Sequence, residues 1–228
     1  MLPLRDQLPT RTVPFINYAI IAANVVVFAL ELSGGIGTEL ELVPARLFSD
    51  PVVGVETIFT SMFMHAGLTH IGGNMLFLWI FGDNVEDAMG HLPYLAFYLL
   101  GGVCAALAQT LASPASTIPM LGASGAIAAV LAAYLFLYPR SPITVINPIP
   151  LLWLFWGLFL QFPAWLVIAE FFLVNLWNAF NNTAQGGVAF MAHVGGFLGG
   201  AVLYRLFTIG RERMDDYARH DQWATRRR

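Results

Sequence analysis

Long apolar runs recur along nearly the whole of this chain, and they restrict its fold more than any other feature. Hydrophobic residues make up 57% of the 228 residues and charged residues only 11%, whereas a soluble domain is close to half apolar and a quarter charged. A bilayer is crossed by a helix of roughly 17–25 mostly apolar residues. The sequence therefore predicts an all-α fold, a polytopic bundle of membrane helices, and not a soluble domain with one anchor.

Six apolar segments approach the length of a membrane crossing. They are expected at residues 15–32, 68–85, 93–111, 124–138, in some part of 149–178, and at 188–207. The fifth is interrupted by Pro150 and Pro163. Together they predict one six-helix membrane domain at 14–208, between a short polar tail at 1–13 and an Arg-rich tail at 209–228.

The connection at 33–57 is long, and it mixes acidic residues with apolar ones such as Leu40, Val43 and Phe48. This mixture is typical of short helices that lie along a membrane surface. An ordinary polar loop fits parts of the segment equally well.

The positions of the arginines predict the orientation of the bundle. With six spans both termini lie on one side of the membrane, and the acidic first loop lies on the other. The arginines on the side of the termini are Arg5, Arg11, Arg140, Arg205, Arg211 and Arg213. Because positively charged segments stay in the cytoplasm, both termini are expected there.

The composition also argues against several classes of function. A formal net charge of −3 argues against a nucleic-acid partner. Lysine is absent, which excludes a lysine base, and a single cysteine, Cys104, excludes an intrachain disulfide. No His-Glu-x-x-His motif is present, and His65 and His70 are five residues apart, so they share a helical face poorly. We therefore expect no metal ion and no other cofactor.

Four polar side chains are expected in the outward halves of the predicted spans: His70, Asn74, Ser124 and His193. Polar side chains inside a membrane are costly, and each is a candidate for a functional role. Their common depth is the first indication that they could meet.

Ser124 begins the fourth predicted span, within Gly122-Ala123-Ser124-Gly125. The first backbone N–H groups of a helix have no intrahelical partner, and the helix dipole there favours negative charge. A nucleophilic serine at this position would have part of an oxyanion site in its own backbone. The alternative, a packing surface of small residues, is common in membrane helices and is favoured for this motif alone.

His193 stands at the start of the sixth predicted span. Gly195 and Gly199, like Gly196 and Gly200, are four residues apart, and this spacing lets two helices approach closely. If the sixth span packs on the fourth, the neutral imidazole could take the serine proton as general base. A histidine that is hydrogen-bonded within the bundle, or a proton relay, is the alternative.

His70 and Asn74 are four residues apart and therefore share one helical face. Both can donate hydrogen bonds to an oxyanion, whose stabilisation contributes strongly to acyl transfer. Alternatively, both hold helices together. Because no carboxylate is expected at this depth, a serine hydrolase built on these residues would use a Ser-His dyad and not a Ser-His-Asp triad.

The three motifs, in this order on six spans, resemble those of the rhomboid family of intramembrane serine proteases. The resemblance covers about residues 56–200, and the matching stretches are 65–74, 122–125 and 192–196. It implies that Ser124 is the nucleophile and His193 the base, with an oxyanion hole formed by His70, Asn74 and the Ser124 backbone N–H. It also implies an endopeptidase that cuts single-span membrane proteins at small residues, in or near the membrane. By the same resemblance, the plain tails suggest a plasma (inner) membrane.

Two positions depart from the family pattern. Glu56-Thr57 stands where many relatives carry Trp-Arg, and Ala128 stands where some relatives carry an aromatic residue that stacks on the catalytic histidine. His193 must therefore be oriented by another group.

The fifth predicted span is the candidate gate for substrate, with a lipid-facing aromatic helix as the alternative. This segment is rich in aromatic residues, among them Trp153, Phe155, Trp156, Phe159 and Phe162.

Two other functions remain open. A non-proteolytic relative that recognises transmembrane helices would be expected to lose the serine or the histidine, and both are present. A small transporter or channel would explain intramembrane His and Asn, although the chain lacks the internal repeat that many transporters show.

Overall fold

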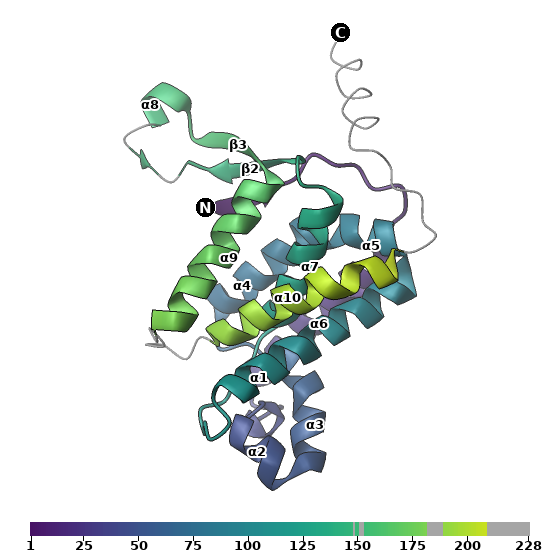
Figure 1. The fold of residues 1–228 in the computed structure, drawn as a ribbon, viewed down its shortest axis with the longest axis vertical. Helices are drawn as coiled ribbons and strands as arrows, with labels where there is room; N and C mark the ends of the chain where they lie inside the picture. The colour runs from purple at the N-terminus through teal and green to yellow at the C-terminus, as the bar shows by residue number, and fades with distance from the viewer. Residues whose placement is uncertain (148, 151–152, 182–188, 209–228) are drawn as a thin grey trace.

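The computed structural model describes residues 1–147, 149–150, 153–181 and 189–208 (Figure 1). It is a bundle of apolar helices, with a small sheet at one end and short helices at the other. The chain is a multi-pass membrane protein, and the predicted polytopic helix bundle is confirmed.

Each predicted apolar segment has a helical counterpart in the bundle. The helices are α1 Phe15–Leu32, α4 Leu68–Phe77, α5 Asp83–Met89, α6 His91–Ala112, α7 Ser124–Leu137, α9 Ala164–Asn181 and α10 Phe190–Phe207. A π-helical turn, Leu78–Gly82, joins α4 to α5. The second helical region therefore continues beyond its predicted end at residue 85, through the acidic cluster to Met89.

The length and hydropathy of each helix decide whether it can cross a membrane. Among the described residues, four helices are long and apolar enough to cross a membrane: α1, α6, α9 and α10. The segments Pro51–Phe63 and Leu68–Met89, bent by 81° at their junction, pass the same test as a pair. Helix α7 has 14 residues, about 21 Å at 1.5 Å per residue. The predicted count of six therefore stays a prediction.

The first loop contains several short helices. They are η1 Thr38–Leu40, α2 Pro44–Ser49, α3 Pro51–Thr60 and η2 Ser61–Phe63. Proline begins both α2 and α3, where its missing N–H costs nothing, and Asp50 accepts a hydrogen bond from the Val53 N–H at 3.4 Å. The helical interpretation of this loop is confirmed for these segments, and their position at a membrane surface stays a prediction.

The N-terminal segment is not the polar tail that the sequence suggests. Its strand β1, Leu2–Arg5, pairs with β2, Pro142–Ile146, which pairs in turn with β3, Phe159–Pro163. All pairings are antiparallel, and the strand order is β1-β2-β3. Distant segments thus close one end of the bundle with a sheet that the all-α prediction did not include.

The predicted fifth span, some part of 149–178, corresponds to α9, which begins halfway along that range. The chain enters α9 only after Pro163, because proline lacks the N–H that a helix interior needs. Before it come β3 and a short helix α8, Trp153–Trp156, which project from the bundle (Figure 1). The five aromatic residues expected to form a gate lie in this projection and not in a spanning helix.

Small residues bring α10 against α6 and α7, as the spacing of its glycines predicts. A Cβ at Gly200 would lie 2.5 Å from the Ala129 Cα, and one at Gly199 would lie 2.6 Å from the Cys104 Cβ. Gly196 likewise faces the Gly125 carbonyl of α7. Close backbone approach of this kind is how membrane helices gain packing energy without a hydrophobic driving force. It places the start of α10 beside the start of α7.

Candidate active site

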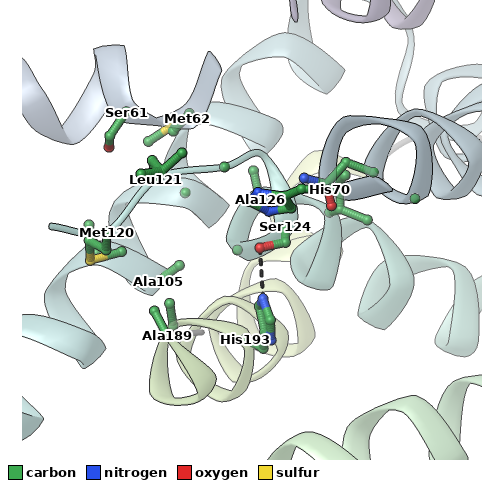
Figure 2. Close-up of a pocket in the computed structure, with 18 of the residues that line it drawn as sticks. Ser61, Met62, His70, Ala105, Met120, Leu121, Ser124, Ala126, Ala189 and His193 are labelled. Carbon is green, nitrogen blue, oxygen red and sulfur yellow. Dashed lines mark hydrogen bonds between the residues drawn. The ribbon is translucent and has the colours of Figure 1, made fainter. Parts of the chain in front are cut away.

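The four polar residues predicted at a common depth line one cavity. Its volume is about 520 Å³, and α4, α6, α7, α9 and α10 all contribute to its wall (Figure 2). His70, Asn74, Ser124 and His193 are all part of that wall. No carboxylate is among the described residues that line it.

Ser124 and His193 lie within hydrogen-bonding distance. Ser124 is the first residue of α7, and His193 lies in the first turn of α10. The Ser124 Oγ and the His193 Nε2 are 2.7 Å apart (Figure 2). The close approach of Gly196 to Gly125 holds the two helix starts together, so the packing motif and the polar pair depend on each other.

The other ring nitrogen of His193 meets Asn175 of α9. The His193 Nδ1 and the Asn175 Oδ1 are 2.5 Å apart. The amide nitrogen of Asn175 donates to the Phe171 carbonyl at 2.8 Å, which fixes the orientation of the amide. Because an amide oxygen only accepts, Nδ1 carries the imidazole proton and Nε2 is left free to accept from Ser124.

Asn175 was not among the predicted site residues. The rule that identified the other four, a polar side chain inside an apolar span, applies equally to this asparagine. The unsettled limits of the fifth span hid it, since its depth could not be assigned. His193, which has no aromatic ring at position 128 to stack on, contacts Asn175 instead.

His70 presents one ring edge to the loop before Ser124. Its Nδ1 accepts a hydrogen bond from the Ala66 N–H at 3.4 Å, so Nε2 carries the proton. A Cβ at Gly122 would lie 2.7 Å from that Nε2. Gly122 also has φ +117°, a conformation that other residues rarely adopt. Glycine is therefore required here for two reasons: other residues rarely adopt this backbone conformation, and a Cβ would lie too close to His70.

Asn74 contacts His65, which the sequence offered only as part of a weak candidate zinc site. The Asn74 Nδ2 lies 3.0 Å from the His65 Nε2. The His65 Nδ1 lies 3.3 Å from the Phe63 carbonyl and donates to it, so Nε2 accepts from the amide. One N–H of Asn74 is thus engaged, and the second remains for the cavity. In the part of the chain that the structure describes, no three His, Cys, Asp or Glu side chains form a metal site.

Together these groups place a candidate nucleophile, a candidate base and hydrogen-bond donors around one space. The Ser124 hydroxyl donates to a neutral imidazole, which is the arrangement that activates a serine. His70 and Asn74 offer N–H groups on the wall of the same cavity, and the Ser124 backbone N–H belongs to the first turn of α7. Such donors stabilise negative charge that develops on an oxygen.

Comparison with known proteins gives a consistent result. Rhomboid protein 1, mitochondrial, of Saccharomyces cerevisiae is 31% identical over 194 residues, which cover 82% of this chain and 51% of that protein. The human presenilin-associated rhomboid-like protein, mitochondrial, is 35% identical over 132 residues, covering 56% of this chain and 34% of that protein. Rhomboid protease GluP of Bacillus subtilis is 32% identical over 127 residues, covering 54% and 24%.

The aligned regions span about half or less of the length of these relatives. Residues 54–209 match the family model of the rhomboid domain. That match covers α4, α6, α7, α9 and α10, which together form the cavity. Since it extends over more than half of the sequence, the chain belongs to the rhomboid family.

Proposed function

We propose that this chain is an intramembrane serine endopeptidase that cleaves single-span membrane proteins at or within the bilayer by a Ser-His mechanism. The observation that carries the proposal is the 2.7 Å contact between the Ser124 Oγ and the His193 Nε2, on the wall of a cavity that His70 and Asn74 also line. The name of the Bacillus subtilis relative, a rhomboid protease, supports the same class of reaction.

In the first half of the reaction, the Ser124 Oγ attacks the carbonyl carbon of the scissile peptide while its proton passes to the His193 Nε2. The carbonyl oxygen becomes an oxyanion, and we assign its stabilisation to the N–H groups of His70, Asn74 and the Ser124 backbone. When the tetrahedral intermediate collapses, the C–N bond breaks and the imidazolium returns its proton to the leaving amine.

In the second half, a water molecule attacks the acyl ester and gives its proton to the His193 Nε2. Collapse of the second intermediate breaks the bond to Oγ, and the imidazolium reprotonates the serine. Neutral His193 is the base in both halves, and no net proton is stored. Water has to reach a site within a membrane helix bundle, and a polar-lined cavity is the kind of space in which this is tolerated.

For its setting, we propose a plasma (inner) membrane with both termini in the cytoplasm, as the arginine distribution predicts. Two of the relatives named above are mitochondrial proteins, so localisation of the tagged full chain decides between the two membranes. Cysteine accessibility at either end of the bundle tests the orientation.

The proposed activity is tested by reconstituting the chain with a single-span substrate and measuring cleavage. Ser124→Ala and His193→Ala are each expected to lower kcat by on the order of 10³-fold or more. Ser61→Ala is the matched control, because it removes another serine hydroxyl from the wall of the same cavity. A fluorophosphonate should label the wild type and the Ser61→Ala variant, and not Ser124→Ala.

Undiminished cleavage by either active-site variant would refute the dyad. A folded wild-type chain that binds transmembrane helices, yet neither cleaves them nor reacts with the fluorophosphonate, would favour a non-proteolytic member of the family. Solute flux without covalent labelling would favour a transporter or channel.

A further inference from the structure

We propose that Asn175 is a positioning residue that holds His193 in the tautomer and orientation required of the general base, so that the site works as a Ser-His-Asn chain. The proposal rests on the proposed function for its catalytic meaning. It goes beyond the expected dyad, which gives His193 one partner and leaves its second ring nitrogen unexplained.

The Asn175 amide is held in one orientation by its own helix. Asn175 lies on α9 and only 8% of it is exposed. Its Nδ2 donates to the carbonyl of Phe171, one turn earlier in α9, at 2.8 Å. Turning the amide over would aim its oxygen at that carbonyl oxygen and would lose this hydrogen bond. The amide oxygen is therefore held toward His193.

The position of the amide oxygen determines which tautomer the His193 imidazole adopts. An oxygen 2.5 Å from Nδ1 selects the tautomer with the proton on Nδ1. Only that tautomer has a lone pair on Nε2 to receive the Ser124 proton. After proton transfer the imidazolium keeps its Nδ1–H bond to the amide oxygen, which partly stabilises the new charge. Without Asn175, the tautomer with the proton on Nε2 becomes available, and it is inactive as a base toward Ser124.

No other described contact of His193 orients its imidazole ring in this way. Ala128, where some relatives carry a stacking aromatic residue, has no ring to offer. The rings nearest to His193 are those of Phe171 and Phe190, with centroids 6.0 and 6.4 Å away. Neither ring is parallel to the imidazole, at 44° and 82°, and neither can accept a hydrogen bond from Nδ1 as an oxygen does. Asn175 therefore determines the orientation of His193.

The titratable groups around His193 are few, which makes a pH experiment interpretable. His70, on α4, is the other titratable side chain among the described residues that line the cavity. Cys104, on α6, packs against Gly199 of α10, on the same helix as His193. Asn175→Asp replaces the amide oxygen by a carboxylate at nearly the same place and so adds one negative charge beside the imidazole of His193.

The test uses the full chain in liposomes, with Asn175→Ala and Asn175→Asp. Asn175→Ala is expected to lower kcat by on the order of 10²–10⁴-fold with little change in KM, because loss of the correct tautomer has an effect of that size in a serine protease triad. Asn175→Asp is expected to keep more activity and to move the acidic limb of the kcat–pH profile to higher pH, because the carboxylate favours the imidazolium. Asn24→Ala is the matched control, since Asn24 is a buried amide with the same bond to a carbonyl four residues earlier.

A merely structural role for Asn175 predicts a different pattern. Stability would then fall in Asn175→Ala and Asn24→Ala alike, and the activity per folded molecule, counted from the monodisperse fraction in size-exclusion chromatography, would stay constant. An acidic limb in Asn175→Asp that coincides with the wild type would overturn the proposal. If Asn175→Ala does not fold, the similarly sized Asn175→Asp still decides.

A readout without cleavage separates this proposal from the proposed function. Nitrogen-15 NMR of labelled histidine is expected to show the His193 proton on Nδ1 in the wild type and a mixture of tautomers in Asn175→Ala. A wild-type proton on Nε2 would refute the positioning role even in an active enzyme. If every variant, Ser124→Ala included, cleaves like the wild type, the proposed function is refuted. The NMR result still stands on its own in that case.

Discussion

Helix α7 begins at a cavity of neutral polar groups and ends, 14 residues later, near a cluster of carboxylates. At its start, Ser124 is linked to His193 and Asn175 by two hydrogen bonds in series. Near its end, the Tyr134 hydroxyl donates to Asp6 at 2.8 Å. The same helix thus connects two buried polar regions of opposite character.

The charged region fastens the N-terminal segment to the bundle. Glu86 is fully buried and accepts hydrogen bonds from the backbone N–H groups of Ile16 and Asn17, at 3.1 and 2.7 Å. These are N–H groups of the first turn of α1, which has no side-chain cap of its own. The carboxylate also receives the His91 Nδ1–H at 2.5 Å. Glu86 therefore caps α1 from a different helix.

The contrast lies in how many partners each group has. The carboxylate of Glu86 accepts from several donors at once, so its position is fixed. Each link of the Ser124–His193–Asn175 chain is a single hydrogen bond with one donor and one acceptor, so its geometry depends on each partner. We therefore expect substitutions at the cavity to change the rate, and substitutions at the charged region to change the stability.

The sharpest test at the cavity is Gly122→Ala. The new Cβ would lie 2.7 Å from the His70 Nε2, and φ +117° is strained for alanine. Displacing His70 removes the oxyanion donor that we propose, so kcat is expected to fall by about 10²–10³-fold. The strained backbone conformation should also lower the free energy of unfolding, by about 1 kcal/mol, which is a smaller effect.

Gly72→Ala is the control for that experiment. Gly72 lies on α4, the helix that carries His70, and a Cβ there meets nothing within 4 Å. Its kcat should match the wild type in the same cleavage assay. A Gly122→Ala enzyme with wild-type kcat would show that His70 is not needed where the structure places it.

The corresponding test at the charged region is Glu86→Ala. It leaves two backbone N–H groups and His91 without their buried partner, and breaking such a buried set costs about 3–5 kcal/mol. Thermal unfolding in detergent measures the loss, and kcat per folded molecule is expected to stay near the wild-type value. Glu170→Ala serves as the comparison, because its carboxylate is part-exposed and is 2.8 Å from the terminal amine of Met1. Its expected cost is below about 1 kcal/mol, and equal losses in the two variants would contradict the distinction.

An intermediate effect is expected for His65→Leu. The substitution removes the acceptor that holds the Asn74 amide at 3.0 Å, without removing Asn74 itself. We expect kcat to fall by about tenfold, the equivalent of one ordinary hydrogen bond of about 1.4 kcal/mol. In an Asn74→Ala background the same change should have almost no further effect on kcat. Additive losses in the double variant would mean that His65 acts by another route.

Local sequence patterns predicted the elements and site residues whose signal lies within one span. Helix α1, Phe15–Leu32, coincides with the first apolar run, and Ser124 and His193 were recognisable as polar residues at the starts of apolar segments. The glycine spacing of α10 predicted the close packing that brings this pair together. These features depend only on neighbours along the chain.

The features that were missed depend on distant partners. Strand β1 exists because it pairs with β2, more than 130 residues later, and no pattern in four residues reveals that. Hydropathy ends the second span before Glu86, yet the helix continues because distant N–H groups satisfy the buried carboxylate. His65 lies in the loop before α4, where depth cannot be assigned from sequence, and Asn175 lies on a helix whose limits the sequence left open.

The smallest expected effect concerns Asp6, the residue next to β1. Burial, and then the nearby Asp83, raise the pKa of Asp6 from 3.8 to about 7. The folded state therefore holds a proton between about pH 4 and 7 that the unfolded state has released, and the stability from this group is lost as the pH rises through 7. Between pH 6 and 8 the loss should be about 1 kcal/mol, measured as a lower unfolding midpoint. Asp6→Asn, which cannot ionise, should remove this slope and leave cleavage at a given pH unchanged, because the cavity lies at the other end of α7. A slope that persists in Asp6→Asn would assign the titration to another group, and a change in kcat would show that the two regions are coupled through α7.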